Sequence, residues 1–391
     1  MTRPDRTLEM LARLVAFDTT SRNSNLDLIA FVEEWLAAHG VASRRIMFGP
    51  DKANLLAVIG PEREGGIVLS GHTDVVPVDD QDWSSDPFTL RVDEAEGRAY
   101  GRGTADMKGF LASALALVPQ LVEMELKRPV ILAFSCDEEV GCTGVRPMIA
   151  WMRENLPPVA GVFVGEPTGM EVVTAHKGII ALTTTVTGRE AHSSCPHLGV
   201  NAAMYAGEII GEIARMAAEE RERAQPESGF EPPWTTISIG RVEGGTARNI
   251  IPRHCVIEWE ARLMPGADPA AIPARLEDFV AREITPRMKA EDPEAGVVTE
   301  VTNAVPGLDP ADDSLPARLA MRFAGSNACG RVSFGTEAGL FAAAGMPAVI
   351  CGPGHIAQAH RPDEYVELDQ LAACDAFLAR LARWCAEAEE A

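Results

Sequence analysis

The sequence predicts an α/β protein with a mostly parallel sheet, interrupted by an inserted α+β segment. Short apolar runs rich in β-branched residues recur, as in Ile67-Val68-Leu69, and each is followed by small or polar residues. Continuous apolar runs of this kind are typical of strands that are covered on both faces, as in parallel sheets. Between residues 177 and 304 the strand-like segments alternate apolar and polar residues instead. At 391 residues the chain exceeds the usual size of one domain, so we expect two.

The first part of the chain alternates helix-like and strand-like segments. Apolar periodicity predicts two helices, the second of which is closed by Gly40 as a carboxyl cap, and a third helix that is interrupted or bent at Pro119. A loop with three glycines, residues 99–109, precedes this third helix and indicates tightly folded backbone. The predicted helices span residues 8–15, 25–39 and 110–125, and the predicted strands span residues 54–59, 67–69, 130–134 and 162–164.

The inserted segment, residues 177–304, has the pattern of a compact α+β domain. It contains predicted strands at 179–186, 236–239, 255–262 and 297–305, and predicted helices at 201–223 and 272–288. The remaining residues, 1–176 and 305–391, form one discontinuous domain. Its second part is predicted to hold a helix at 315–325, a tight turn at 335–339, a strand at 348–351 and a helix at 368–388.

Charge and composition exclude several classes of protein. The net charge of −22 argues against nucleic-acid and anionic-membrane partners, both of which require a basic surface. No apolar stretch reaches the roughly 18 residues of a membrane span, and the amino terminus lacks the apolar core of a signal peptide. We therefore expect a soluble, cytoplasmic enzyme. The eight cysteines are scattered without a C-x-x-C pair and are expected to be buried, reduced thiols.

Groups able to bind metal follow four of the predicted apolar strands. They are His72, the pair Glu138 and Glu139, Glu166, and either His355 or His360, and Asp106 adds a fifth group from the glycine-rich loop. The carboxyl ends of parallel strands meet at one edge of a sheet, where ligands bind. Buried carboxylates repel one another and are costly, and a pair of divalent cations would neutralise them.

The residue types narrow the choice of metal. Two histidines with several carboxylates suit Zn²⁺, and Co²⁺ or Mn²⁺ are also compatible, whereas the lack of cysteine in these motifs argues against a structural zinc site. Asp74 follows His72 by two positions and could accept a hydrogen bond from the far ring nitrogen, which would fix the tautomer of the histidine.

Five ordered motifs together resemble the M20 family of di-metal peptidases and deacylases. They are Ser70-Gly71-His72-Thr73-Asp74, the stretch from Gly101 to Gly109, Asp137-Glu138-Glu139, Gly165-Glu166-Pro167 and Ala359-His360. The resemblance covers essentially the whole chain. It implies a di-metal aminopeptidase-like catalytic domain with a central mixed, mostly parallel sheet, and an inserted α+β (ferredoxin-like) lid and dimerisation domain.

The resemblance also implies roles for single residues. One cation would be held by His72 and Glu166, a second by Glu139 and His360, and Asp106 would bridge the two. Glu138 matches the family's general base, which takes a proton from the attacking water and returns it to the leaving amine. The Asp106–Met107 peptide bond is typically cis in this family.

Further matches lie in or next to the inserted segment. His192 matches a histidine that, in dimeric members, reaches a partner's site and stabilises the oxyanion, and the resemblance therefore implies a homodimer. Asn249 and Arg262 match positions that hold the substrate's α-carboxylate, and Gly335 and Thr336 offer further donors to the same group. Both His192 and Arg262 could also be ordinary surface residues. His355, five residues before His360, is interpreted as a residue at the edge of the pocket.

Within the family the chain looks most like acetylornithine deacetylases, through residues 332–341 and 358–365. This likeness implies hydrolysis of an N-acyl amino acid, arginine biosynthesis and two Zn²⁺ ions per chain. Other M20 activities remain open: deacetylation of N-acetyl-diaminobutyrate, desuccinylation of succinyl-diaminopimelate, aminoacylase or dipeptidase activity. A metal-binding protein without catalysis is the alternative from another class, and the intact Glu138 argues against it.

Overall fold

The computed structural model describes residues 4–387 and divides the chain into two compact units. The first unit comprises the chain up to Ala175, Pro310–Arg331 and the chain from Thr336 onward, and the second comprises His176–Asp309 and Val332–Gly335. This division gives His176, residues 305–309 and residues 332–335 to the second unit, whereas the sequence placed the limits at 177 and 304. Residue 388, the last of the predicted closing helix, lies outside the described residues.

The first unit is built on an eight-stranded mixed sheet with the strand order β1-β2-β6-β3-β7-β14-β8-β13. The four neighbouring strands β6, β3, β7 and β14 run parallel, whereas β1, β2 and β8 each pair antiparallel with a neighbour. The strands are β1 (Ser43–Phe48), β2 (Lys52–Ile59), β3 (Gly66–His72), β6 (Val130–Ser135), β7 (Val159–Val164), β8 (Val173–His176), β13 (Gly330–Val332) and β14 (Ala348–Ile350). The prediction of a mixed, mostly parallel central sheet is therefore confirmed.

Helices cover both faces of this sheet. Along β3, Ile67 and Leu69 join the core cluster that includes the helices α1, α2, α3, α8 and α10, while the intervening Val68 points to the other face. On that other face α4 and α9 contact each other and the strands β6 and β7. The helices are α1 (Asp5–Val15), α2 (Leu26–Ala38), α3 (Gly109–Glu123), α4 (Val145–Asn155), α8 (Leu315–Ala324), α9 (Ala338–Ala343) and α10 (Leu368–Ala386).

A small antiparallel sheet of β4 (Arg91–Asp93), β5 (Arg98–Tyr100) and β15 (Tyr365–Glu367) completes the first unit. It joins the glycine-rich loop, which follows β5, to the segment that follows β14. Helix α3 begins just after this loop and runs through Pro119 to Glu123. The expectation that no apolar stretch reaches the length of a membrane span is wrong for Thr104–Glu123, the one such helix within the described residues. Of its apolar window, 78% is buried inside the fold, as in a core helix.

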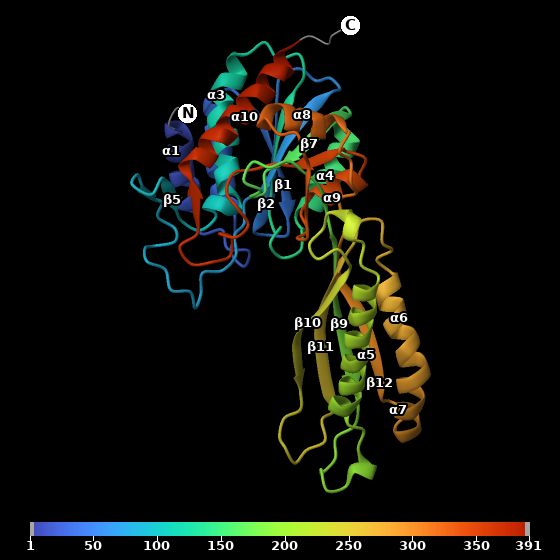
Figure 1. Cartoon of the computed structure of the whole chain (residues 1–391). Coiled ribbons are helices and arrows are strands. Elements are labelled where there is room, and N and C mark those ends of the chain that lie inside the picture. Colours follow the sequence, from blue (N-terminus) through green and yellow to red (C-terminus); the bar gives the residue numbers. More distant parts are fainter. Residues whose placement is uncertain (1–3, 388–391) are drawn as a thin grey trace. The chain divides into compact units, whose positions relative to one another are not determined.

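The second unit is a four-stranded antiparallel sheet in the order β10-β11-β9-β12. Side chains of β9 alternate between buried and half-buried, with Ile180, Leu182 and Val186 at buried positions and Thr183, Thr185 and Thr187 at half-buried ones. Helices α5, α6 and α7 pack on the sheet around Leu182, Ile209 and Ile257 (Figure 1). The elements are β9 (Gly178–Thr187), α5 (Ala202–Glu222), β10 (Thr236–Gly244), β11 (His254–Leu263), α6 (Ala271–Phe279), α7 (Thr285–Glu291) and β12 (Gly296–Val305). The single helix expected over 272–288 is divided by a wider helical turn, Val280–Ile284.

Candidate active site

The candidate active site lies where the central parallel strands end. His72 is the last residue of β3, Glu138 and Glu139 follow β6, and Glu166 follows β7. These strands are neighbours in the order β6-β3-β7, so their carboxyl ends present the side chains at one sheet edge. His360 comes from the segment between β14 and β15.

Two groups of possible metal ligands form here and share one residue. His72, Asp106 and Glu166 make the first group, and Asp106, Glu139 and His360 make the second. Within each group the ligand atoms lie within 4.8 Å of one another. The geometry therefore brings together all five residues that the sequence predicted as ligands, and it selects His360 rather than His355.

The two carboxylate oxygens of Asp106 face different groups. Its Oδ1 lies 3.0 Å from Nε2 of His72, and its Oδ2 lies 3.3 Å from Nε2 of His360. The same His360 nitrogen is 3.1 Å from Oε2 of Glu139. Asp106 is buried in the glycine-rich loop, and its peptide bond to Met107 is cis, as the family resemblance implied.

The electrostatics of this cluster fit a pair of cations. Burial, reinforced by the neighbouring Asp106 carboxylate, raises the pKa of Glu139 to about 7, and burial raises the pKa of Glu166 well above its usual range. Oε1 of Glu139 is buried without a hydrogen-bond partner among the described residues. Crowded, incompletely paired carboxyl groups are costly in a protein interior, and divalent cations remove that cost. Imidazole and carboxylate donors suit Zn²⁺, Co²⁺ or Mn²⁺.

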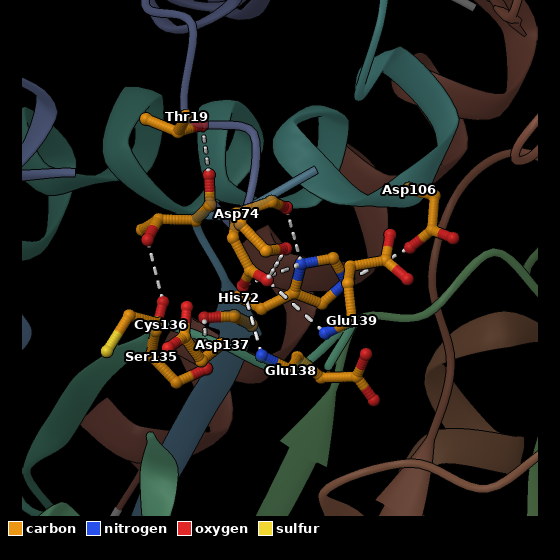
Figure 2. Close-up of polar contacts among 12 residues, drawn as sticks. Thr19, His72, Asp74, Asp106, Ser135, Cys136, Asp137, Glu138 and Glu139 are labelled. Atoms are coloured by element: carbon orange, nitrogen blue, oxygen red, sulfur yellow. Dashed lines mark hydrogen bonds and ion pairs between the residues drawn. The ribbon is translucent and has the colours of Figure 1, made fainter. Parts of the chain in front are cut away.

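Asp74 orients the site in a different way from the one predicted. Nδ1 of His72 lies 2.8 Å from the backbone carbonyl oxygen of Asp74, while the Asp74 carboxylate is 3.7 Å from that nitrogen. The carboxylate instead accepts hydrogen bonds from the backbone amides of Glu138 and Glu139, at 3.1 and 3.3 Å (Figure 2). Because the carboxylate oxygens of Asp74 bind these amides, it is the backbone carbonyl of Asp74 that fixes the tautomer of His72.

Glu138, the expected general base, lies next to a buried thiol. Sγ of Cys142 donates a hydrogen bond to Oε1 of Glu138 at 3.2 Å. Burial raises the pKa of Glu138 to about 8. The expectations from the sequence missed Cys142, because nothing in the motif shows that the turn after Glu139 brings this side chain back.

A second missed residue is Ser21, whose hydroxyl donates to Oδ2 of Asp74 at 2.7 Å. Lys52 bonds both the carbonyl of Ser21 and the carboxylate of Asp137. These contacts link the turn after α1 to the turn that carries Glu138. The only signal for Ser21 in the sequence is that it ends a polar stretch, Asp18-Thr19-Thr20-Ser21, between two predicted helices.

The predicted substrate residues fall mostly in the second unit. His192 is exposed, with Nδ1 2.7 Å from the hydroxyl of Ser194, and Asn249 is also exposed. Arg262, on β11, forms a two-point ion pair with Glu260, at 3.0 and 3.1 Å. Gly335 belongs to the second unit and Thr336 to the first.

Thr336 and His355 each have a local contact. The Thr336 hydroxyl accepts a hydrogen bond from the backbone amide of Ala338 at the start of α9. His355 is exposed and pairs through its backbone with Thr168, and it belongs to neither ligand group.

Comparison with known proteins agrees with this arrangement. The model of peptidase family M20/M25/M40 matches residues 68–384, the range that contains both ligand groups. The chain belongs to the M20 family. It is therefore a hydrolase of a family of metal enzymes, and its two ligand groups are the candidate sites for the metals.

Two curated relatives match almost the full length of the chain. The acetylornithine deacetylase of Myxococcus xanthus is 36% identical over 384 residues, which are 96% of this chain and 96% of the relative. The acetylornithine deacetylase of Pasteurella multocida is 32% identical over 370 residues, 93% of either chain.

Solved structures of M20 proteins have the same fold. The metallo-carboxypeptidase Sso-CP2 of Sulfolobus solfataricus aligns with a TM-score of 0.77 at 18% identity, over 98% of this chain and 99% of its own. The YXEP protein of Bacillus subtilis, described as a dinuclear metal-binding peptidase of the family, aligns with a TM-score of 0.67 at 18% identity, over 97% of each chain. This M20 architecture agrees with the fold class expected from the sequence.

Proposed function

We propose that this M20 hydrolase deacetylates N2-acetyl-L-ornithine to L-ornithine and acetate, as part of arginine biosynthesis in the cytoplasm. The observation that supports it most is that two ligand groups share Asp106, while Glu138 belongs to neither group and follows the same strand as the ligand Glu139. The full-length similarity to two acetylornithine deacetylases favours this substrate over those of other M20 members.

In this proposal the ligand residues divide between two cations. His72 and Glu166 would hold one, Glu139 and His360 would hold the other, and Asp106 belongs to both ligand groups. When bound, the cations polarise the acyl oxygen and lower the pKa of an attacking water. Zn²⁺ is the proposed metal, and Co²⁺ or Mn²⁺ fit the same donors.

Glu138 carries the proton. Its Oε1 accepts a hydrogen bond from the Cys142 thiol. We therefore assign Oε2 as the oxygen that receives the proton of the attacking water. The same oxygen then gives the proton to the amide nitrogen as the C–N bond breaks, which releases acetate and the free amine. The Asp74 carboxylate keeps Glu138 in place by accepting a hydrogen bond from the Glu138 backbone amide.

The second unit supplies substrate recognition in this proposal. Arg262 and Asn249, with Gly335 and Thr336, bind the α-carboxylate, and His192 stabilises the oxyanion from a partner subunit of a homodimer. Arg262 must then exchange its contact with Glu260 for the substrate carboxylate. We propose the second unit as the lid and dimerisation domain.

The test is release of acetate or another acid from a substrate panel by purified enzyme. The panel contains N-acetylornithine, N-acetyldiaminobutyrate, N-acetylmethionine, N-succinyl-diaminopimelate and a dipeptide, each assayed after chelation and after return of Zn²⁺, Co²⁺ or Mn²⁺. We expect the highest kcat/KM with N-acetylornithine and no turnover without metal. If another compound of the panel gives a higher kcat/KM, that compound replaces N-acetylornithine as the proposed substrate. If metal-loaded protein hydrolyses none of the compounds, the result favours a non-catalytic metal-binding protein.

A further inference from the structure

The loop that carries Asp106 is folded around the carboxylate of Glu364. Oε1 of Glu364 accepts hydrogen bonds from the backbone amides of Ala105 and Asp106, at 2.9 and 3.1 Å. Its Oε2 accepts from the amide of Gly103 at 3.0 Å and from Nη1 of Arg102 at 2.7 Å. Four donors fill the accepting capacity of one carboxylate, which is only 1% exposed.

Arg102 extends this contact toward His360. Its guanidinium is 1% exposed, and Nη2 donates to Oε1 of Gln81 at 2.6 Å. Nε2 of Gln81 donates in turn to the backbone carbonyl of His360 at 3.1 Å. Hydrogen bonds thus run without interruption from the Asp106 amide, through Glu364, Arg102 and Gln81, to the His360 backbone.

The two ends of this network are members of one ligand group. Asp106 and His360 are far apart in the sequence, and the His360 side chain is 53% exposed, so local packing restrains it little. His360 also has a positive φ of 63°, a conformation that a non-glycine residue adopts only when its surroundings hold it. The network restrains the backbone at both residues, and therefore the separation of their ligand atoms.

We propose that Glu364 is a positioning residue of the metal centre, which acts with Arg102 and Gln81 by holding the Asp106 loop and the His360 backbone in register. This inference rests on the proposed function only in taking the two ligand groups as metal sites. Glu364 contacts neither group through a ligand atom. Its effect passes through the amide of Asp106 and, by way of Arg102 and Gln81, through the carbonyl of His360.

A simpler account is that Arg102 and Glu364 form a buried ion pair that stabilises the fold alone. Removing one partner of such a pair destabilises a protein wherever the pair lies. The two accounts differ in metal binding by folded protein. A hydrogen-bond partner that orients a ligand typically contributes 10- to 100-fold to metal affinity, whereas a pair that stabilises only the fold leaves the affinity of folded protein unchanged.

The experiment is titration of metal-free, full-length protein with Co²⁺, followed by visible absorption and calorimetry. Glu364→Gln keeps the size of the side chain and removes its charge, and Glu364→Asp keeps the charge but withdraws it by one methylene. Asp375→Asn is the matched control, because Asp375 is a half-buried carboxylate of the same unit that accepts a hydrogen bond from Thr7, away from the ligands. We expect about 10- to 100-fold weaker Co²⁺ binding and an altered spectrum in both Glu364 variants, and neither change in the control.

Gln81→Ala keeps the test decisive even if the Glu364 variants fail to fold. Gln81 is half-buried in a loop, and its loss removes the contact with the His360 carbonyl without touching Glu364. We expect this variant to bind one Co²⁺ equivalent more weakly and the other with unchanged affinity, because the first ligand group lacks His360. Wild-type affinity and spectrum for Gln81→Ala, or for a folded Glu364 variant, overturn the proposal. Wild-type protein that binds no Co²⁺ contradicts the proposed metal centre itself.

Discussion

The thiol of Cys142 lies 3.2 Å from Oε1 of Glu138 and donates a hydrogen bond to it. Burial raises the pKa of this thiol well above its ordinary value, so the sulfur keeps its proton at neutral pH and remains a donor. The contact fixes which oxygen of Glu138 is free. It therefore links a residue without chemistry of its own to the proton transfer proposed for Glu138.

Replacing Cys142 tests this link. Cys142→Ala removes the donor, and we expect kcat to fall about fivefold, since one neutral hydrogen bond contributes about 1 kcal/mol. Cys142→Ser restores a donor of similar size and should recover most of the rate. Steady-state kinetics of the two variants check this, and equal rates for alanine and serine would show that the thiol only fills space.

Glu138→Gln separates proton transfer from metal binding. The amide keeps the shape of the side chain but cannot take a proton, so we expect kcat to fall by about 10²- to 10⁴-fold. Metal analysis of the same sample should still give about two ions per chain, because Glu138 is in neither ligand group. Turnover near that of the wild type would remove Glu138 from the mechanism.

Asp74 is expected to matter mainly through its carboxylate. In Asp74→Ala the backbone carbonyl still accepts from His72, but the amides of Glu138 and Glu139 lose their acceptor. We expect about a 10- to 100-fold loss of activity and of metal affinity, with circular dichroism unchanged. Asp79→Ala, at an exposed position, is the control. If Asp74→Ala has the activity and metal affinity of this control, Asp74 is only a turn residue.

His176 predicts a pH dependence of stability. Burial lowers its pKa to about 4, below the ordinary value of 6.5, so the folded protein holds it neutral. Because the unfolded chain binds the proton more readily between these values, the contribution of His176 is present above pH 6.5 and is lost as the pH falls toward 4. Near pH 5 the loss amounts to about 2 kcal/mol.

Urea unfolding of metal-free protein at pH 7.5 and pH 5 checks this expectation. His176→Gln cannot titrate, so its stability should fall less over this interval than that of the wild type, whatever its absolute stability. An equal fall in both proteins would show that other groups account for the acid sensitivity.

The sequence predicted the site best where a metal-binding or catalytic residue comes directly after a buried strand. The runs at residues 67–69, 130–134 and 162–164 are apolar and lie just before His72, Glu138 and Glu166. They therefore predicted strands of a covered parallel sheet, whose polar ends meet at one edge. The same reasoning failed at β1, because this edge strand exposes Arg44 and Arg45 and shows no clear apolar period.

Side-chain contacts between distant segments could not be predicted in this way. Whether His72 is oriented by the carbonyl or the carboxylate of Asp74 depends on where the turn after β6 places its amides. Likewise Glu364 lies within residues 358–365, yet its four donors come from a loop more than 250 positions earlier in the chain. Periodicity and spacing carry no information on such pairings.

The order of the ligands along the chain has a consequence for biosynthesis. His72, Asp106 and Glu166 all precede the second unit, whereas His360 follows it. A growing polypeptide emerges from its amino terminus, so a nascent chain can complete only the first ligand group before the second unit has been made. In the proposed metal centre, the second ligand group is therefore complete only after synthesis has passed His360.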